Sequence, residues 1–355
     1  MKLFPVFLIL LLNQVRSEPL KWLTYEGKKG PGLGRHIVLI SGDEEYRSEE
    51  SLPMLAKILS EHHGFKCTVL FAIDPSNGCI NPYVNNNIPG LEHLKSADLM
   101  FIATRWRELP DEQMKLIDDY LMSGRPVAGI RTSNHAFRNK SGNYLHYSQD
   151  YKDKGSGADP EDPWFRGFGG LVFGDHYHKH HGKHKHESTR GVFAPGSAEH
   201  PVLRGIGDGE IWAATDVYGC RVSHLPITPL LLGQVLKRVG NYDEKDKTFG
   251  MRSTDVPLTG PENSPMIPVA WTKKYRHPES TREGLAFHTS MGSSTDLESA
   301  ALRRLVINGI YYVLNMPVPE KGANVNLVGE HKTSQFGFWG KKFWDQKKLR
   351  VEDLK

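Results

Sequence analysis

Cysteine is scarce in this sequence. The 355 residues include three cysteines, Cys67, Cys79 and Cys220, and their spacing matches no zinc-binding motif. Three thiols allow at most one intramolecular disulfide, even in an oxidising compartment. Cys67 lies in a strand-like run, where we expect a buried and unreactive side chain. The sequence therefore argues against a disulfide-rich scaffold and against a cysteine-based zinc site.

A strong net charge and a long hydrophobic run are also missing. The formal net charge is +4, which is too weak to predict a nucleic-acid partner. The apolar stretch at residues 3–12 is shorter than the roughly 20 residues that a transmembrane helix needs. We therefore expect neither nucleic-acid binding nor membrane insertion of the mature chain.

The N-terminus has the pattern of a signal peptide. Lys2 precedes the apolar stretch, and Val15 and Ser17 occupy the small-residue positions that a signal peptidase prefers. We expect residues 1–17 to be removed, so that the mature protein begins near Glu18 and is secreted or periplasmic. An uncleaved anchor or a buried helix is the alternative interpretation.

Strands and amphipathic helices alternate along the first half of the chain. Hydrophobic residues make up 38% and charged residues 24%, as in a soluble globular protein with a core. Short apolar runs predict buried strands at residues 36–41, 67–72, 97–103 and 126–130. Helices are predicted after Ser48 and after Pro110. This order predicts an α/β fold with a doubly wound, mostly parallel sheet flanked by helices.

Residues 35–316 are expected to form one domain, after a lead-in segment at 18–34 and before a C-terminal tail at 317–355. Polar, glycine-containing sequence predicts an insertion at about 139–165, and a histidine-rich loop follows at 174–187. Further strand-like runs lie at 171–173, 190–194, 211–214, 229–235, 267–271 and 285–289. The last helix is predicted over 296–314.

Polar segments follow the predicted strands at residues 42–47, 104–108 and 131–135, and the histidine-rich loop is a fourth. Ligands in open α/β sheets bind beyond the carboxyl ends of the strands, so we expect one shared site. Alternatively, these loops only cap the sheet, and acidic side chains offset a helix N-terminus. The predicted catalytic residues are Asp43, Arg131, His178 and His181. The predicted substrate-binding residues are Glu44, Arg105, Trp106, His135, Asp216 and Tyr218.

Residues 129–131 end a buried strand and lead through a small polar turn, which is the setting of a nucleophile elbow. Arginine does not lose its proton, so Arg131 cannot be a nucleophile. A guanidinium at the end of a buried strand needs a carboxylate or an anionic ligand. We therefore predict that Asp43 or Glu44 lies within hydrogen-bonding distance of Arg131, or that the ligand supplies the negative charge.

An ordered set of short motifs runs through the chain. The motifs are SGD at residues 41–43, GIR at 129–131, HAF at 135–137, HPVLRGI at 200–206, TDVYG at 215–219 and FHTSMG at 287–292. In this order they resemble the ThuA-like (trehalose-utilisation) family of the class I glutamine amidotransferase-like superfamily. The resemblance implies a flavodoxin-like three-layer α/β sandwich and a role linked to sugars, often beside enzymes that form keto sugars. Class I amidotransferases carry cysteine where Arg131 stands, so glutamine hydrolysis through a thioester is excluded at this position.

Six histidines crowd the loop at residues 174–187. Imidazoles bind zinc, copper or nickel, but so dense a run resembles an exposed loop, and its interleaved lysines oppose a cation. We expect no cofactor and no tight stoichiometric metal. A bound Zn²⁺ would use His176, His178, His180 and His181. The alternative is that His178 or His181 points into the site as an acid/base group.

These residues favour an enzyme that acts on a carbohydrate, by hydrolysis, elimination or isomerisation of an oxidised (keto) glycoside. His178 or His181 would remove a proton, and Arg131 would neutralise the developing negative charge. A non-catalytic sugar-binding or scaffold protein is the second hypothesis, because the elbow lacks a nucleophile. A metal-dependent hydrolase is the third.

Overall fold

A single large sheet runs through the computed structural model, which describes residues 19–219 and 227–355. The predicted signal peptide and Cys220 lie outside these residues. The strand order is β1-β3-β2-β4-β5-β13-β12-β10-β7-β8, with β11 paired to β10. The strands are β1 (Trp22–Tyr25), β2 (His36–Gly42), β3 (Lys66–Leu70), β4 (Leu99–Thr104), β5 (Val127–Ile130), β7 (Glu187–Phe193), β8 (Ile211–Ala213), β10 (Thr228–Lys237), β11 (Val256–Pro257), β12 (Ile267–Arg276) and β13 (Glu283–Thr289). A second sheet pairs β6 (Lys179–His180) with β9 (Tyr218–Gly219).

The centre of the sheet is parallel and its flanks are antiparallel. Strands β3, β2, β4, β5 and β13 pair in parallel, whereas β1 at one edge and β12, β10, β7 and β8 at the other add antiparallel pairs. Gly42 pairs with Thr104, and Ile102 pairs with Gly129. The carboxyl ends of β2, β4 and β5 therefore share one edge of the sheet, as predicted.

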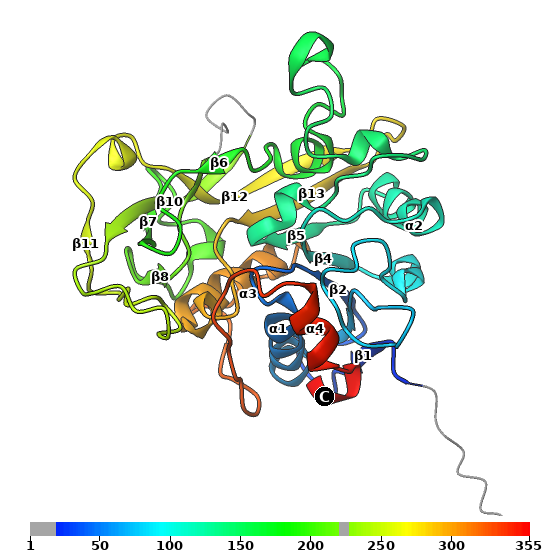
Figure 1. Cartoon of the computed structure of the whole chain (residues 1–355), viewed down its shortest axis with the longest axis horizontal. Helices are drawn as coiled ribbons and strands as arrows, with labels where there is room; N and C mark the ends of the chain where they lie inside the picture. The colour runs from blue at the N-terminus through cyan, green and yellow to red at the C-terminus, as the bar shows by residue number, and fades with distance from the viewer. Residues whose placement is uncertain (1–18, 220–226) are drawn as a thin grey trace, which may run out of the picture.

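Helices cover both faces of the sheet (Figure 1). Helices α1 (Ser48–His63) and α3 (Ala300–Val313) pack on the face that contains Ile37 and Leu39 of β2. Helix α2 (Asp111–Met122) packs on the opposite face, with Val38 and Ile40. This alternation along β2 is the period of two expected for a strand that is buried on both sides. The predicted α/β fold with three layers is confirmed.

Two segments differ from what their sequence suggested. Residues 171–173 were expected to form a strand, but Gly169–Phe173 form one π-helical turn. Only glycine fits at position 169, because a Cβ there would lie 1.9 Å from the carbonyl oxygen of Asn134 in the turn after β5. The C-terminal tail, which had no assignment, forms α4 (Lys341–Lys347) beside α1 (Figure 1).

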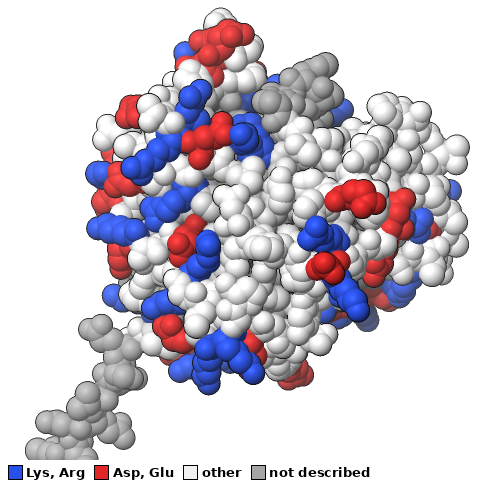
Figure 2. All heavy atoms as spheres, turned by 180° about the vertical axis from the view of Figure 1, so that it is seen from behind, with Lys and Arg blue, Asp and Glu red and all other residues white. Residues whose placement is uncertain are grey.

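Surface features match the weak net charge. On the face shown in Figure 2, basic and acidic side chains are interspersed across the surface. Within the described residues, no helix combines the length and apolar character needed to cross a membrane.

Candidate functional site

The turn after β5 has the geometry of an elbow. Arg131 opens the 3₁₀ turn Arg131–His135 with a φ of 49°, a left-handed conformation that is uncommon outside glycine. The turn is tightly packed, because a Cβ on Gly129 would lie 2.4 Å from Ser133 Oγ. This strand, sharp turn and short helix agree with the elbow expected from the sequence.

The Arg131 side chain is enclosed by protein groups and is 1% exposed. Its Nη1 donates to the carbonyl oxygens of Asp216 (2.9 Å) and Ser290 (2.6 Å), and its Nη2 donates to the Tyr46 hydroxyl (2.9 Å). Asp216 Oδ1 lies 3.4 Å from Nη2. The guanidinium carbon also lies 3.8 Å from the ring centre of Tyr218. Arg131 therefore organises the interior of the site and does not face a ligand.

The prediction that Asp43 or Glu44 pairs with Arg131 is wrong. Asp43 Oδ1 instead accepts hydrogen bonds from two backbone amides of its own loop, at 2.7 and 2.9 Å. Aspartate commonly makes hydrogen bonds of this kind in turns, and here they keep the Asp43 carboxylate within its own loop and away from Arg131. Glu44 pairs with Arg105. The carboxylate that reaches Arg131 is Asp216, 85 residues away in the chain.

Asp43 also connects the loop after β2 to the elbow, because its Oδ2 accepts a hydrogen bond from the Thr132 hydroxyl, and both side chains are buried. Thr132→Val keeps the side-chain shape and removes the donor. We expect the free energy of unfolding to fall by about 1.5–3 kcal/mol, the range for hydrogen bonds to charged groups. The exposed Thr24→Val is the control, with an expected change below about 0.5 kcal/mol. Equal losses in the two variants by urea denaturation would contradict this role of Thr132.

Glu44 holds two arginines together at the carboxyl end of β4. Its Oε2 lies 3.1 Å from Arg107 Nη2, and its Oε1 accepts a hydrogen bond from Arg105 Nη1. Burial raises the pKa of Glu44, and the guanidinium groups of Arg107 and Arg105 oppose this effect. Arg107 also donates to the carbonyl oxygens of Pro82 (2.8 Å) and Val84 (3.1 Å). Glu44 and Arg107 thus form one hydrogen-bonded wall of the site.

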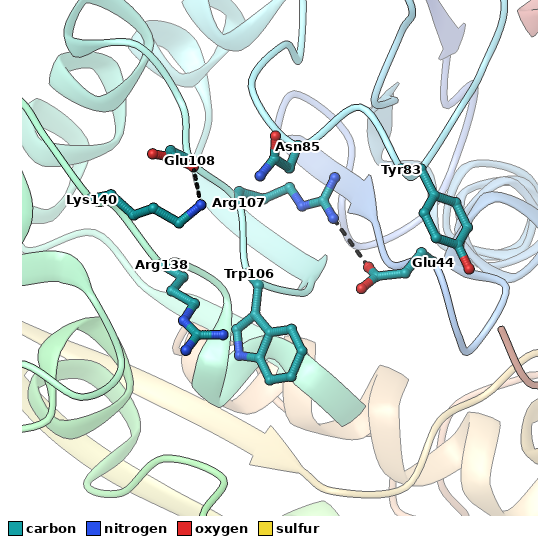
Figure 3. A pocket seen from close by; sticks show the side chains of 8 residues that line it. All are labelled: Glu44, Tyr83, Asn85, Trp106, Arg107, Glu108, Arg138 and Lys140. Atoms are coloured by element: carbon teal, nitrogen blue, oxygen red, sulfur yellow. Dashed lines mark hydrogen bonds and ion pairs between the residues drawn. The ribbon is translucent and has the colours of Figure 1, made fainter. Parts of the chain in front are cut away.

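A polar pocket of about 270 Å³ opens beside this wall (Figure 3). It is lined by Glu44, Tyr83, Asn85, Trp106, Arg107, Glu108, Arg138 and Lys140. The guanidinium carbon of Arg105 lies 3.6 Å from the Trp106 ring centre, and that of Arg138 lies 5.3 Å from it. Lys140 Nζ pairs with Glu108 at 3.3 Å. The pocket offers an aromatic ring and several hydrogen-bonding groups to a polar ligand.

His184 lies between two carboxylates. Its Nδ1 is 2.9 Å from Asp216 Oδ1, and its Nε2 is 3.3 Å from Glu45 Oε1. His180 Nδ1 is 2.6 Å from Asp216 Oδ2. The side chains of His180 and His184 are 39% and 24% exposed, whereas that of Asp216 is fully buried. Both imidazoles therefore connect a buried anion to solvent.

Burial and neighbouring charges shift the acidity of these groups. Burial raises the pKa of Glu45 to about 7, although Arg105 opposes the shift. Burial would also raise the pKa of Asp216, but hydrogen bonds from His180 and His184 hold it well below its usual range. Burial lowers the pKa of His184, and its hydrogen bond to Asp216 opposes that effect.

The predicted histidines point in different directions. His180 contacts Asp216, as described above, but His181 Nε2 lies 2.7 Å from a backbone carbonyl oxygen of the loop after β11. His176 is 1% exposed, and His178 lies beside β9. His181 thus contacts a backbone carbonyl oxygen and not Arg131, and the assignment of His178 as the base stays a prediction.

Two other predicted contact residues lie inside the site. His135 and Tyr218 are 2% and 3% exposed. The hydroxyl of Tyr218 lies 3.0 Å from that of Tyr46, and its ring covers Arg131. Burial, and then the charge of Arg105, lowers the pKa of His135 far below its usual range. The rings of His135 and Tyr218 are therefore part of the packed interior of the site and are not open to a substrate.

Three features of the site were missed by sequence reasoning: His184, the carboxylate of Glu45 as its partner, and the C-terminal tail. The Gly337 amide donates to the Glu45 carbonyl oxygen at 2.8 Å, and the Phe336 ring centre lies 5.6 Å from that of His184. The spacing of His180 and His184 was the only available signal. No sequence pattern predicts the position of the tail, because it depends on a contact between Gly337 and Arg47, which are 290 residues apart in the chain.

Among residues 19–219 and 227–355, no cysteine lies at the elbow. Cys67 and Cys79 are buried and lie in other parts of the fold, and burial raises the pKa of the Cys67 thiol. Ser133 Oγ lies 3.0 Å from His288 Nδ1, but both side chains are fully buried. This serine–histidine contact is therefore closed to a substrate.

Several solved structures are similar to this chain, among them the following three. One is a protein from Bacteroides uniformis described as ThuA-like, with 12% identity over 81% of this chain and 93% of that chain, at a TM-score of 0.41. Another, from Parabacteroides merdae, is also described as ThuA-like. It has 13% identity over 85% of this chain and 97% of that chain, at a TM-score of 0.44. The third is a cytoplasmic protein from Salmonella typhimurium, with 13% identity over 82% and 100%, at 0.36. No protein-family model and no curated protein match the chain.

Proposed function

We propose that this chain is an exported enzyme that acts on a carbohydrate, by hydrolysis, elimination or isomerisation of an oxidised (keto) glycoside. One observation carries the proposal: the pocket and the histidine–carboxylate centre belong to one network. Glu44 lines the pocket and binds Arg105, whose Nε lies 3.8 Å from Glu45, the carboxylate beside His184. A ligand in the pocket would be connected through Glu44 and Arg105 to groups that can transfer protons.

The pocket suits one sugar unit. Its volume of about 270 Å³ is just below the range of about 300–1,000 Å³ for drug-sized ligands. Trp106 supplies an aromatic ring that Arg105 covers in part, while Tyr83 and Asn85 supply hydrogen-bonding groups. Arg138 lies exposed at the rim and replaces the enclosed Arg131 as the cation available to the substrate.

Elimination illustrates the chemistry. A base removes the proton from the carbon next to the keto group, and the resulting enolate is stabilised by a cation. The enolate electrons then break the glycosidic carbon–oxygen bond at the neighbouring carbon, and the departing oxygen takes up a proton. Glutamine amidotransfer is not part of the proposal, because Arg131 stands where that reaction needs a thiol. Export is supported by the signal-like pattern of residues 1–17.

The test is turnover of a panel of keto-glycosides by the mature chain and three variants. We expect Trp106→Ala to raise KM about tenfold, which is ~1.4 kcal/mol of binding. We expect His184→Asn to lower kcat by about 10²–10⁴-fold. The exposed Lys115→Ala, on the outer surface of α2, is the control and should match the parent.

A non-catalytic sugar-binding protein is the second candidate, and the enclosed guanidinium of Arg131 favours it. Binding by calorimetry that Trp106→Ala weakens, with no turnover of any glycoside, would replace the enzyme by this candidate. Absence of both binding and turnover would overturn the carbohydrate assignment.

A further inference from the structure

We propose that His180, His184 and Asp216 form a binding site for one divalent metal ion, with Zn²⁺ as the favoured ion. The inference deepens the proposed function and rests on it for the role of the metal. Of the residues that the structure describes, these three place one ligand atom each within 4.8 Å of one another. Two imidazole nitrogens and one carboxylate oxygen are a ligand set that Zn²⁺ uses in catalytic sites.

The surroundings of His184 are the strongest argument for a cation. Both of its ring nitrogens face carboxylates, Nδ1 toward Asp216 and Nε2 toward Glu45. A neutral imidazole has one N–H, so only one nitrogen can donate. If Nε2–H donates to Glu45, the lone pair of Nδ1 faces Asp216 Oδ1 at 2.9 Å. Without a metal, the other tautomer donates its Nδ1–H to Asp216. A metal ion bound to Nδ1 and Oδ1 selects the tautomer whose Nε2–H is donated to Glu45.

The same arrangement supplies the outer contact of a metal-bound histidine. Histidine ligands usually donate their second ring N–H to a carboxylate or carbonyl group, which fixes the tautomer and the ring orientation. Glu45 is placed to accept that bond from His184, and its backbone is held by the tail through Gly337. Glu45 is therefore a positioning residue for the metal ligand.

The charges around the site admit a cation. Four carboxylates gather here, Asp43, Glu44, Glu45 and Asp216, against the three guanidinium groups of Arg105, Arg107 and Arg131. These groups therefore include one more carboxylate than guanidinium group, and their sum is negative when all four carboxylates are ionised. Of the loop lysines that seemed to oppose a cation, Lys179 and Lys183 are exposed to solvent, and Lys185 Nζ packs 5.2 Å from the Phe249 ring centre.

An open coordination position would face solvent. His180 is 39% exposed at its side chain, so its side of the cluster can receive water or a substrate oxygen. Catalytic zinc sites combine three protein ligands with one water, and the metal makes that water acidic or polarises a carbonyl group. Either effect would serve the keto-glycoside chemistry proposed above.

The site differs from the one expected of the histidine-rich run alone. Of the four histidines named as ligands from the sequence, only His180 belongs to the cluster, and Asp216 joins it from beyond β8. Loose metal binding by the histidine-rich loop should depend on all six of its histidines. The proposed site depends only on His180 and His184. That difference provides the matched control.

The experiment uses the mature chain without a histidine tag. After removal of metal and dialysis against Zn²⁺, elemental analysis should find one equivalent in the parent and in His181→Gln. His180→Gln and His184→Gln should each weaken binding at least tenfold, measured by competition with a chromogenic chelator. Co²⁺ in place of Zn²⁺ should give a visible absorption band that His184→Gln abolishes and His181→Gln retains. Thermal melts of the metal-free proteins verify folding.

Two results would overturn the metal site. One is equal loss of Zn²⁺ in all three variants, which indicates loose binding by the loop. The other is a folded parent that holds no stoichiometric metal, which indicates that His184 balances its two carboxylates as an imidazolium. Turnover that persists in the metal-free protein would refute the catalytic role of the metal and leave the proposed function standing. Tight Zn²⁺ binding without turnover would refute the proposed enzymatic function and leave the metal site standing.

Discussion

Arg131→Lys is expected to lower the free energy of unfolding by about 3–5 kcal/mol, the cost of leaving a buried charge without its partners. The guanidinium bonds two carbonyl oxygens, the Tyr46 hydroxyl and the carboxylate of Asp216, and it stacks on two tyrosine rings. Lysine keeps the charge but has no planar fork, so it cannot reach these partners together. Urea denaturation measures the loss.

The control is Arg276→Lys, an exposed position at the end of β12. A surface change of this kind should alter stability by less than about 0.5 kcal/mol. Because Arg131 is enclosed, the variant should keep its affinity for a bound sugar nearly unchanged under conditions where it is folded. Unchanged stability with lost turnover would show instead that Arg131 acts on the substrate.

Glu49→Gln is expected to stabilise the protein in a pH-dependent manner. Glu49 lies in the first turn of α1, is 1% exposed, and neither carboxylate oxygen reaches a donor on another described residue. Burial raises its pKa from 4.5 to about 7, although Arg47 opposes the shift. The folded state therefore binds this proton more tightly than the unfolded state does. The resulting stabilisation is full below pH 4.5 and is lost as the pH rises through 7.

Above pH 7 the parent protein buries an ionised carboxylate that glutamine replaces with a neutral amide. At ~1.4 kcal/mol per pKa unit, the variant should gain up to about 3 kcal/mol at pH 8.5 relative to its effect at pH 4.5. Glu61→Gln, exposed near the end of the same helix, should stay within about 0.5 kcal/mol at both pH values. Chemical denaturation at the two pH values measures these changes in the free energy of unfolding. A change that is the same at both pH values for Glu49→Gln would refute the prediction.

A metal ion would also explain why so many charged groups are buried at this edge of the sheet. Desolvated carboxylates and guanidinium groups are costly unless they are paired, and here they pair in an extended network from Glu44 to Asp216. Such networks are often retained where a site must hold a fixed geometry. The pocket beside Trp106 and the two solvent-facing imidazoles are the parts of the network that a ligand can reach.

The sequence by itself determined the layers of the fold and the edge at which the site lies. Buried strands appear as apolar runs, and the helices α1 and α2 show their inward faces through spacing. The parallel order then places the ends of β2, β4 and β5 together, and Asp43, Trp106 and Arg131 follow these ends at one edge of the sheet.

Only the tertiary structure decided which side chains meet there. Asp216 rather than Asp43 neutralises Arg131, and His184 rather than His181 joins the centre, because both choices depend on loops that have no periodic pattern. A regular strand or helix fixes the direction of each side chain through its repeat, whereas the loop at 174–187 takes its course from distant contacts. The tail beside Glu45 is the clearest case, since its position depends on packing against a segment at the other end of the chain.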